Sequence, residues 1–153
     1  MDETIKIAGI QMSPEILNKD RNLNRCLDFI KITAEERTQL IVFPEATLSG
    51  YVFNSLEEVL PVADTIPGAA TESIMKLCRQ LNVYVILGLI EEDRGKYYNS
   101  AAFVGPYGLI GKYRKLHLPF LGIDRFLNHV SRIGVSLIKL SSLNPHLNLI
   151  FAI

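Results

Sequence analysis

The sequence predicts a domain of the α/β class, because strand-like apolar runs alternate with two stretches of helical periodicity along the first half of the chain. The length of 153 residues, 48% of them hydrophobic, suits one domain with a substantial core. Lys plus Arg and Asp plus Glu each number 16, so the net charge is zero. This balance argues against a nucleic-acid-binding protein.

The first three elements are predicted to be a strand, a helix and a second strand. Residues 5–12 mix β-branched and small residues and are typical of a strand. After Asp20, apolar residues recur at the spacing of one helix face. Residues 40–43 form a short apolar run before Pro44, which indicates a strand buried on both faces. The apolar helix positions are Leu23, Cys26, Leu27, Ile30 and Ala34.

A second helix and three strands are predicted to follow. The helix runs over 69–81, after Pro67 and Gly68, and the strongest strand pattern covers 83–90. A polar turn over 91–96 should return the chain as an antiparallel strand over 97–104, and 109–113 is extended again. Lys112 and Arg114 are expected on a solvated strand face. The sheet is therefore expected to be mixed.

The composition changes near the C-terminal end. No Asp or Glu occurs after Arg125, and residues 131–153 show no element with its own start and stop signals. The last three residues are apolar, although a domain normally finishes in polar residues. We therefore expect a domain over 1–126 and an aberrant apolar tail over 127–153.

Two residues are candidates for chemistry. Glu45 follows a buried strand, where active-site groups of open α/β sheets collect, and could act as a general base. Lys115 follows the last strand and could hydrogen-bond a developing oxyanion. Taken singly, each residue is better explained as a solvated side chain. Cys26 and Cys78 lie on the apolar stripes of helices, so core packing is favoured over nucleophilic reactivity.

Other functional classes find no support in the sequence. His117, His129 and His146 lack metal-ligand spacing, and no glycine-rich phosphate loop is present. We therefore expect no metal site. No apolar run reaches the 18 residues of a membrane span, and no signal-peptide core follows the acidic first residues. These observations favour a cytoplasmic protein without membrane or nucleic-acid partners.

Several segments, in this order, resemble the carbon–nitrogen hydrolases, or nitrilase superfamily. They are IKIAGIQM (5–12), LIVFPEATLSGY (40–51), a long stretch over 85–119 that ends in KYRKLHLP, and FLGIDRF (120–126). The resemblance implies an α-β-β-α sandwich, of which this chain carries the first half. It also implies hydrolysis of non-peptide C–N bonds in amides, ureido compounds or nitriles by a Glu-Lys-Cys triad, without a cofactor.

The resemblance assigns roles to particular residues. Glu45 matches the family's general base, and Lys115 matches the lysine that stabilises the tetrahedral intermediate. Tyr51, His117 and Asp124 are expected to line the substrate pocket. The family's nucleophile lies in a Gly-x-x-Ile-Cys-Tyr-like segment beyond the lysine, but this sequence has no cysteine after Cys78. The chain is therefore expected to be inactive on its own.

Two explanations of the tail remain open. A shifted reading frame is one hypothesis. Residues 150–153 could be encoded by the codons ATA-TTT-GCT-ATT. If translation starts at the third base of the first codon, the same bases read ATT-TGC-TAT, which encodes the Ile-Cys-Tyr of the family's nucleophile segment. The alternative is a non-catalytic, truncated relative that acts by association with a partner subunit. The expected substrate is a small amide or nitrile, without further specification, and a homo-oligomer is possible by analogy with the family.

Overall fold

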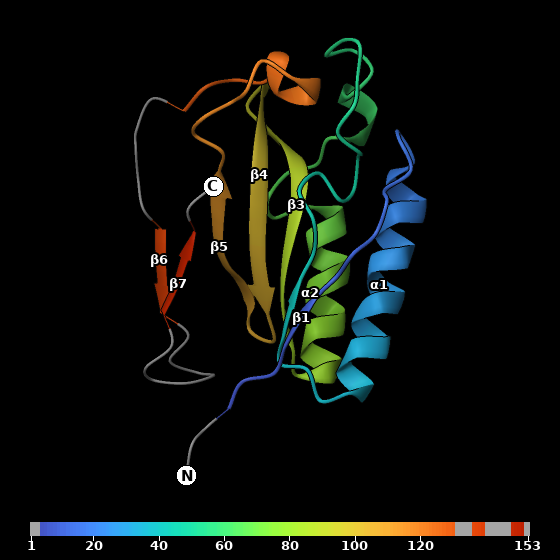
Figure 1. Cartoon of the computed structure of the whole chain (residues 1–153), viewed down its shortest axis with the longest axis vertical. Helices are drawn as coiled ribbons and strands as arrows, with labels where there is room; N and C mark the ends of the chain where they lie inside the picture. Colours follow the sequence, from blue (N-terminus) through green and yellow to red (C-terminus); the bar gives the residue numbers. More distant parts are fainter. Residues whose placement is uncertain (1–3, 131–135, 140–147, 152–153) are drawn as a thin grey trace.

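Five strands pair in chain order to form one mixed sheet in the computed structural model, which describes residues 4–130, 136–139 and 148–151 (Figure 1). The first three strands are parallel, and the last three form two antiparallel hairpins. The predicted α/β class with a mixed sheet is confirmed. The strands are β1 (Ile7–Gly9), β2 (Leu40–Val42), β3 (Tyr84–Asp93), β4 (Lys96–Gly105) and β5 (Gly108–Arg114).

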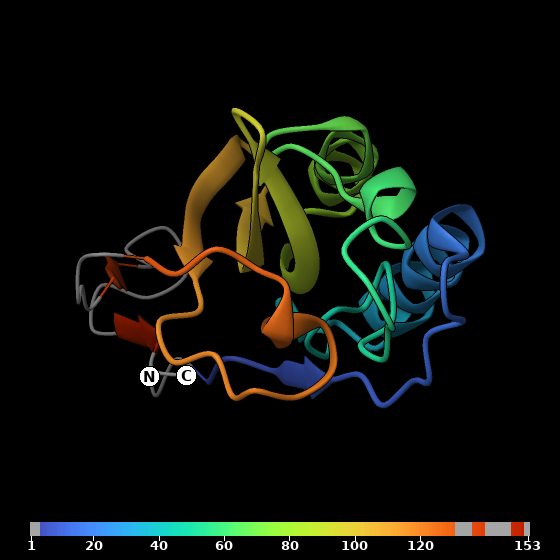
Figure 2. The same cartoon turned by 90° about the horizontal axis from the view of Figure 1, so that it is seen from above.

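Two helices make the crossovers between the parallel strands and cover one face of the sheet (Figure 2). Helix α1 (Lys19–Glu35) begins where the Asn18 side chain accepts a hydrogen bond from the Arg21 backbone N–H. Helix α2 (Ala69–Leu81) has the predicted bounds and ends at Asn82, whose φ of 53° is left-handed. A short 3₁₀ helix, η1 (Leu60–Val62), precedes α2.

The sheet buries apolar side chains on both faces. The helices pack on the face that carries Val85, Leu87 and Leu89, together with both cysteines. Cys26 and Cys78 are wholly buried, and burial raises the pKa of each thiol to about 12. The prediction that both cysteines pack in the core is confirmed. The opposite face buries Leu40, Tyr84, Ile86 and Phe103.

The turn predicted over 91–96 is shorter in the structure. Strand β3 continues to Asp93, and the turn consists of Arg94 and Gly95, both with positive φ. Glu91 therefore lies inside the sheet, and its side chain is fully buried. The prediction failed because three consecutive acidic residues look like a solvated turn, although a buried carboxylate is stable once it is paired.

Lys112 and Arg114 supply that pairing. The predicted solvated face is correct for Lys112, which is exposed, but not for Arg114, which is half-buried. The Glu91 carboxylate accepts hydrogen bonds from Lys112 Nζ, from Arg114 Nε at 2.8 Å and Nη2 at 2.6 Å, and from Ser100 Oγ at 2.7 Å. Arg114 also binds Asp93 and lies 3.8 Å from the centre of the Tyr98 ring. Side chains of β3, β4 and β5 thus meet on the sheet face that carries the helices, beyond the N-terminal end of α2. These contacts fix β5 to β3.

Two further strands lie in the region after Arg125, where the sequence predicts no element. Strands β6 (Ser136–Lys139) and β7 (Asn148–Phe151) pair with each other as an antiparallel hairpin, and β6 contacts β5 (Figure 1). The apolar runs of this region thus pair as strands although clear start and stop signals are missing. In the part of the chain that the structure describes, no helix is long and apolar enough to span a bilayer.

Candidate active site

Glu45 and Lys115 both lie at the end of the sheet where β1, β2, β3 and β5 have their carboxyl ends. Glu45 follows β2 in a turn that is tied to β3. The Thr47 N–H donates to the Gly88 carbonyl at 2.9 Å, and the Gly88 N–H donates to the Pro44 carbonyl at 3.2 Å. A side chain at Gly88 would lie 2.6 to 2.7 Å from the backbone of residues 44–46, so only glycine permits this approach.

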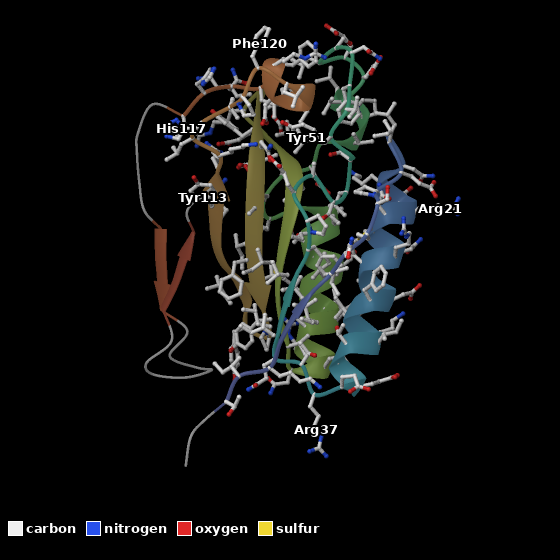
Figure 3. All side chains as sticks on the ribbon, viewed as in Figure 1. Arg21, Arg37, Tyr51, Tyr113, His117 and Phe120 are labelled. Atoms are coloured by element: carbon white, nitrogen blue, oxygen red, sulfur yellow. The ribbon has the colours of Figure 1, made fainter. Side chains whose placement is uncertain are left out.

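Lys115 extends the pairing of β5 with β4 by one residue. Its N–H donates to the Asn99 carbonyl at 2.8 Å, directly after the strand that Arg114 fixes to Glu91. The side chain therefore leaves the sheet on the face opposite the helices. Figure 3 shows Tyr51, Tyr113 and His117 in the same upper part of the molecule, where β5 ends.

The Lys115 ammonium bridges two carboxylates. Its Nζ lies 2.7 Å from Glu45 Oε1 and 2.7 Å from Asp124 Oδ2. Asp124 belongs to the 3₁₀ helix η2 (Gly122–Arg125), and its side chain is fully buried, whereas 43% of the Glu45 side chain is exposed. One carboxylate thus anchors the lysine, and the other remains open to solvent or to a ligand.

Two neutral side chains complete this cluster. The Asn99 amide Nδ2 donates to Glu45 Oε1 at 2.6 Å and to Asp124 Oδ1 at 2.8 Å. The Tyr51 hydroxyl donates to Asp124 Oδ2 at 2.9 Å, and its ring centre lies 5.7 Å from Lys115 Nζ. Asp124 therefore accepts hydrogen bonds from three different side chains, which offset the cost of burying its charge.

The electrostatics favour a protonated lysine. Burial opposes the charge of Lys115, but its hydrogen bonds to Asp124 and Glu45, with the charges of both carboxylates, outweigh that effect and raise its pKa. Burial, followed by the hydrogen bond to Asp124, raises the pKa of the Tyr51 phenol to about 12. At neutral pH the site therefore presents an ammonium and an un-ionised phenol.

A cavity of about 280 Å³ opens beside Glu45 and Lys115 on the sheet face away from the helices. Its wall is mainly apolar, and Glu45, Asn99 and Lys115 contribute charged and polar groups to it. A pocket of this kind can hold a small molecule with one polar group. The remaining lining residues are Val42, Phe43, Pro44, Ile86, Gly88, Ser100, Ala101 and Tyr113.

Four of the five predicted site residues come together in the structure. Glu45, Lys115 and Asp124 are in direct contact, and Tyr51 binds Asp124. His117 is exposed and is not one of the described residues that line the cavity. Within the described part of the chain, no cluster of His, Cys, Asp and Glu could hold a metal ion.

Sequence reasoning did not single out Asn99, which joins the two carboxylates. One feature of the sequence could have pointed to Asn99. It is the lone amide in the strand segment 97–103, YYNSAAF, and it lies on the same sheet face as Tyr113 and Lys115. An amide inside a buried strand must find hydrogen-bond partners. This requirement would have marked Asn99 as a residue with a polar neighbourhood.

Fold and site together define an α/β protein with a carboxylate and an ammonium paired at the carboxyl ends of its strands. The carbon-nitrogen hydrolase family model matches residues 6–135, and this chain belongs to that family.

Individual proteins agree with this assignment. The chain is 44% identical over 115 residues to a nitrilase of Pyrococcus abyssi (strain GE5 / Orsay), an alignment that covers 74% of this chain and 44% of the nitrilase. It is 36% identical over 114 residues to an (R)-stereoselective amidase of Pseudomonas sp, covering 74% of this chain and 40% of the amidase. The chain thus spans less than half the length of these relatives.

A solved structure of an N-terminal amidase with a Gln-Val peptide superimposes on the chain with a TM-score of 0.78 at 27% identity. The superposition covers 95% of this chain and 38% of the amidase. The fold is therefore that of a nitrilase-superfamily protein, in agreement with the sequence-based expectation, over part of the length of the known structures.

Proposed function

We propose that Glu45 is the general base and Lys115 the oxyanion-stabilising residue of a carbon–nitrogen hydrolase site. The observation that carries this proposal is the contact of 2.7 Å between Lys115 Nζ and Glu45 Oε1 at the edge of an apolar cavity. A carboxylate can take a proton from a nucleophile, and an ammonium within hydrogen-bond reach stabilises negative charge on oxygen. Both groups face the same space.

The hydrogen-bond capacity of the pair supports these roles. An ammonium has three N–H donors, and those of Lys115 serve Glu45 and Asp124, which leaves one for a ligand. Glu45 receives its hydrogen bonds from Lys115 and Asn99 on Oε1. Among the described residues none donates to Oε2. One donor and one acceptor are thus available at the cavity.

The proposed reaction proceeds through a thioester. A thiol gives its proton to Glu45 and attacks the carbonyl carbon of an amide, while the oxyanion is stabilised by Lys115. The amine takes the proton and leaves, and a thioester remains. Water then gives a proton to Glu45 and attacks the thioester, which releases the acid and the thiol. A nitrile would reach a thioester through a thioimidate, which adds one water and loses ammonia.

The substrate class follows from the cavity and from the relatives. The matched proteins are named as a nitrilase and amidases, and the apolar wall of the cavity fits a short aliphatic chain. A small aliphatic amide or nitrile is therefore the proposed substrate. The charged end of the cavity would receive its amide or cyano group.

The 153-residue polypeptide is proposed to bind such a substrate without hydrolysing it. Cys26 and Cys78 are wholly buried in the helix-side core, on the other face of the sheet from Glu45 and Lys115. Neither thiol can reach the cavity. A non-catalytic protein that acts by association with a partner subunit is the competing proposal, and it does not require an amide to bind at the cavity.

The test combines turnover with binding. The purified chain is incubated with butyramide and butyronitrile, and ammonia release is compared with that of Glu45→Gln. We expect no release above that of the variant. Butyramide added to ¹⁵N-labelled protein should shift signals of residues around the cavity, and Lys115→Met should weaken this binding. Turnover that Glu45→Gln abolishes would refute the proposed inactivity, and absence of butyramide binding would refute the substrate site.

A further inference from the structure

Asn99 occupies an unusual place between the two carboxylates of the site. It lies in β4, is 4% exposed, and its side chain leaves the strand on the cavity face. Its single amide nitrogen donates to Glu45 Oε1 and to Asp124 Oδ1. An amide nitrogen carries two hydrogens, so Asn99 can offer one to each carboxylate.

These hydrogen bonds are not required for the sheet. The backbone of Asn99 is already paired, with Ile90 in β3 and through its carbonyl with the Lys115 N–H. An apolar side chain at this position would cost the strand no backbone hydrogen bond. The amide therefore serves the carboxylates and not the fold of β4.

Asn99 and Lys115 together restrict the rotation of the Glu45 carboxylate. The terminal torsion of a glutamate is broad and nearly two-fold, so a free carboxylate exchanges its oxygens readily. Here Asn99 in β4 and Lys115, which follows β5, donate to the same atom, Oε1. Rotation would break both charge-assisted hydrogen bonds at once. The atom Oε2 is therefore held in one place, without a donor among the described residues.

We propose that Asn99 is a positioning residue that holds Glu45 Oε1 and thereby presents Oε2 to the cavity as the basic atom. This inference rests on the proposed role of Glu45 as general base. Asn99 acts through Glu45 and not on the substrate. Because it also binds Asp124, it sets the spacing of the two carboxylates around the Lys115 ammonium.

The first experiment reads the Asn99 amide directly by NMR and needs no change at Asn99. Both of its side-chain protons should give signals at low field, because each is hydrogen-bonded to a carboxylate. Glu45→Gln should move mainly one of these signals to higher field, and Asp124→Asn mainly the other. If neither variant moves an Asn99 signal, the bridging geometry and the inference are overturned.

The second experiment measures binding of butyramide to the wild-type chain and to Asn99→Leu, which keeps a similar volume but has no donor. We expect binding at least five-fold weaker. Thr71→Val is the matched control. Thr71 is fully buried in α2, away from the site, and exchanges hydrogen bonds with Gly68. Thr71→Val should unfold at a lower urea concentration than wild type. Its affinity for butyramide should remain within two-fold of the wild-type affinity.

The outcomes separate the inference from the proposed function. If wild type does not bind butyramide, the proposed function fails and the role of Asn99 fails with it. If wild type binds and Asn99→Leu binds equally well, the proposed function stands and the positioning role is refuted. If Asn99→Leu does not fold, the NMR response of Asn99 to Glu45→Gln and Asp124→Asn decides.

Discussion

Replacement of Glu91 by Gln should destabilise the fold more than any exposed charge replacement. Both carboxylate oxygens of Glu91 are occupied, Oε1 by Lys112 and Arg114, and Oε2 by Arg114 and Ser100. A glutamine keeps the shape but exchanges one oxygen for an NH₂ group. In either orientation of the amide, that group faces N–H donors, so at least one of them loses its acceptor.

The size of the loss follows from burial. The Glu91 side chain is 0% exposed, whereas Lys112 and Arg114 are 35% and 22% exposed. Removing one partner of a buried ion pair costs roughly 3–5 kcal/mol. Because water can reach part of both cations, we expect about 2–4 kcal/mol. This loss corresponds to a urea midpoint lower by about 1–2 M.

Urea unfolding, followed by circular dichroism, measures this effect against Glu35→Gln. Glu35 is an exposed residue in the last turn of α1, and its replacement should change stability by no more than about 0.5 kcal/mol. Equal midpoints for the two variants would refute the reasoning that β5 is held to β3 by this buried cluster.

The pH dependence gives a second check on the same variant. Burial opposes ionisation of Glu91, but hydrogen bonds from Arg114, Lys112 and Ser100 outweigh it and lower its pKa in the folded protein. A lowered pKa contributes stability above the unfolded value of about 4.3, and that contribution is lost as pH falls through the folded value. The difference between wild type and Glu91→Gln should therefore be largest near neutral pH and should shrink below about pH 4.

Three further predictions follow from the structure. Gly88→Ala should lower stability by about 1–3 kcal/mol and shift the NMR signals of Glu45, because the new Cβ meets the backbone of residues 44–46; unchanged Glu45 signals would contradict this. Cys26 and Cys78 should not react with a thiol reagent in the folded protein at pH 8 but should both react in urea, because burial raises each pKa to about 12; rapid native labelling would disprove this. In an ultraviolet titration, the tyrosinate absorbance lost in Tyr51→Phe should appear near pH 12, and a difference already visible near pH 10 would count against the hydrogen bond of the phenol to Asp124.

Local patterns were sufficient to predict the main elements of the fold. Pro67 and Gly68 before the apolar stripe of 69–81 predicted α2 with its observed bounds. A short apolar run before Pro44 also located β2, and the turn signals between extended runs located β4 and β5. The extent of β3 was underestimated at Glu91, because local patterns cannot show that cations from another strand will neutralise a buried acid.

The candidate site was predictable only in part. Glu45 and Lys115 could be named because they follow strands and match a family pattern, and the structure places them in contact. The lone amide of Asn99 indicated only a polar neighbourhood, and its partners could not be named, because they lie 54 positions before it and 25 positions after it in the chain. Periodicity and propensity describe neighbours along one element and carry no information about such distant partners.

Titration of the Lys115 side-chain nitrogen by ¹⁵N NMR tests the central claim most directly. The claim is that one ammonium holds Glu45 and Asp124 at the same cavity. The Lys115 pKa should lie above that of an ordinary lysine and should fall in both Glu45→Gln and Asp124→Asn. An ordinary pKa that neither variant changes would show that the three groups do not meet and would contradict the account.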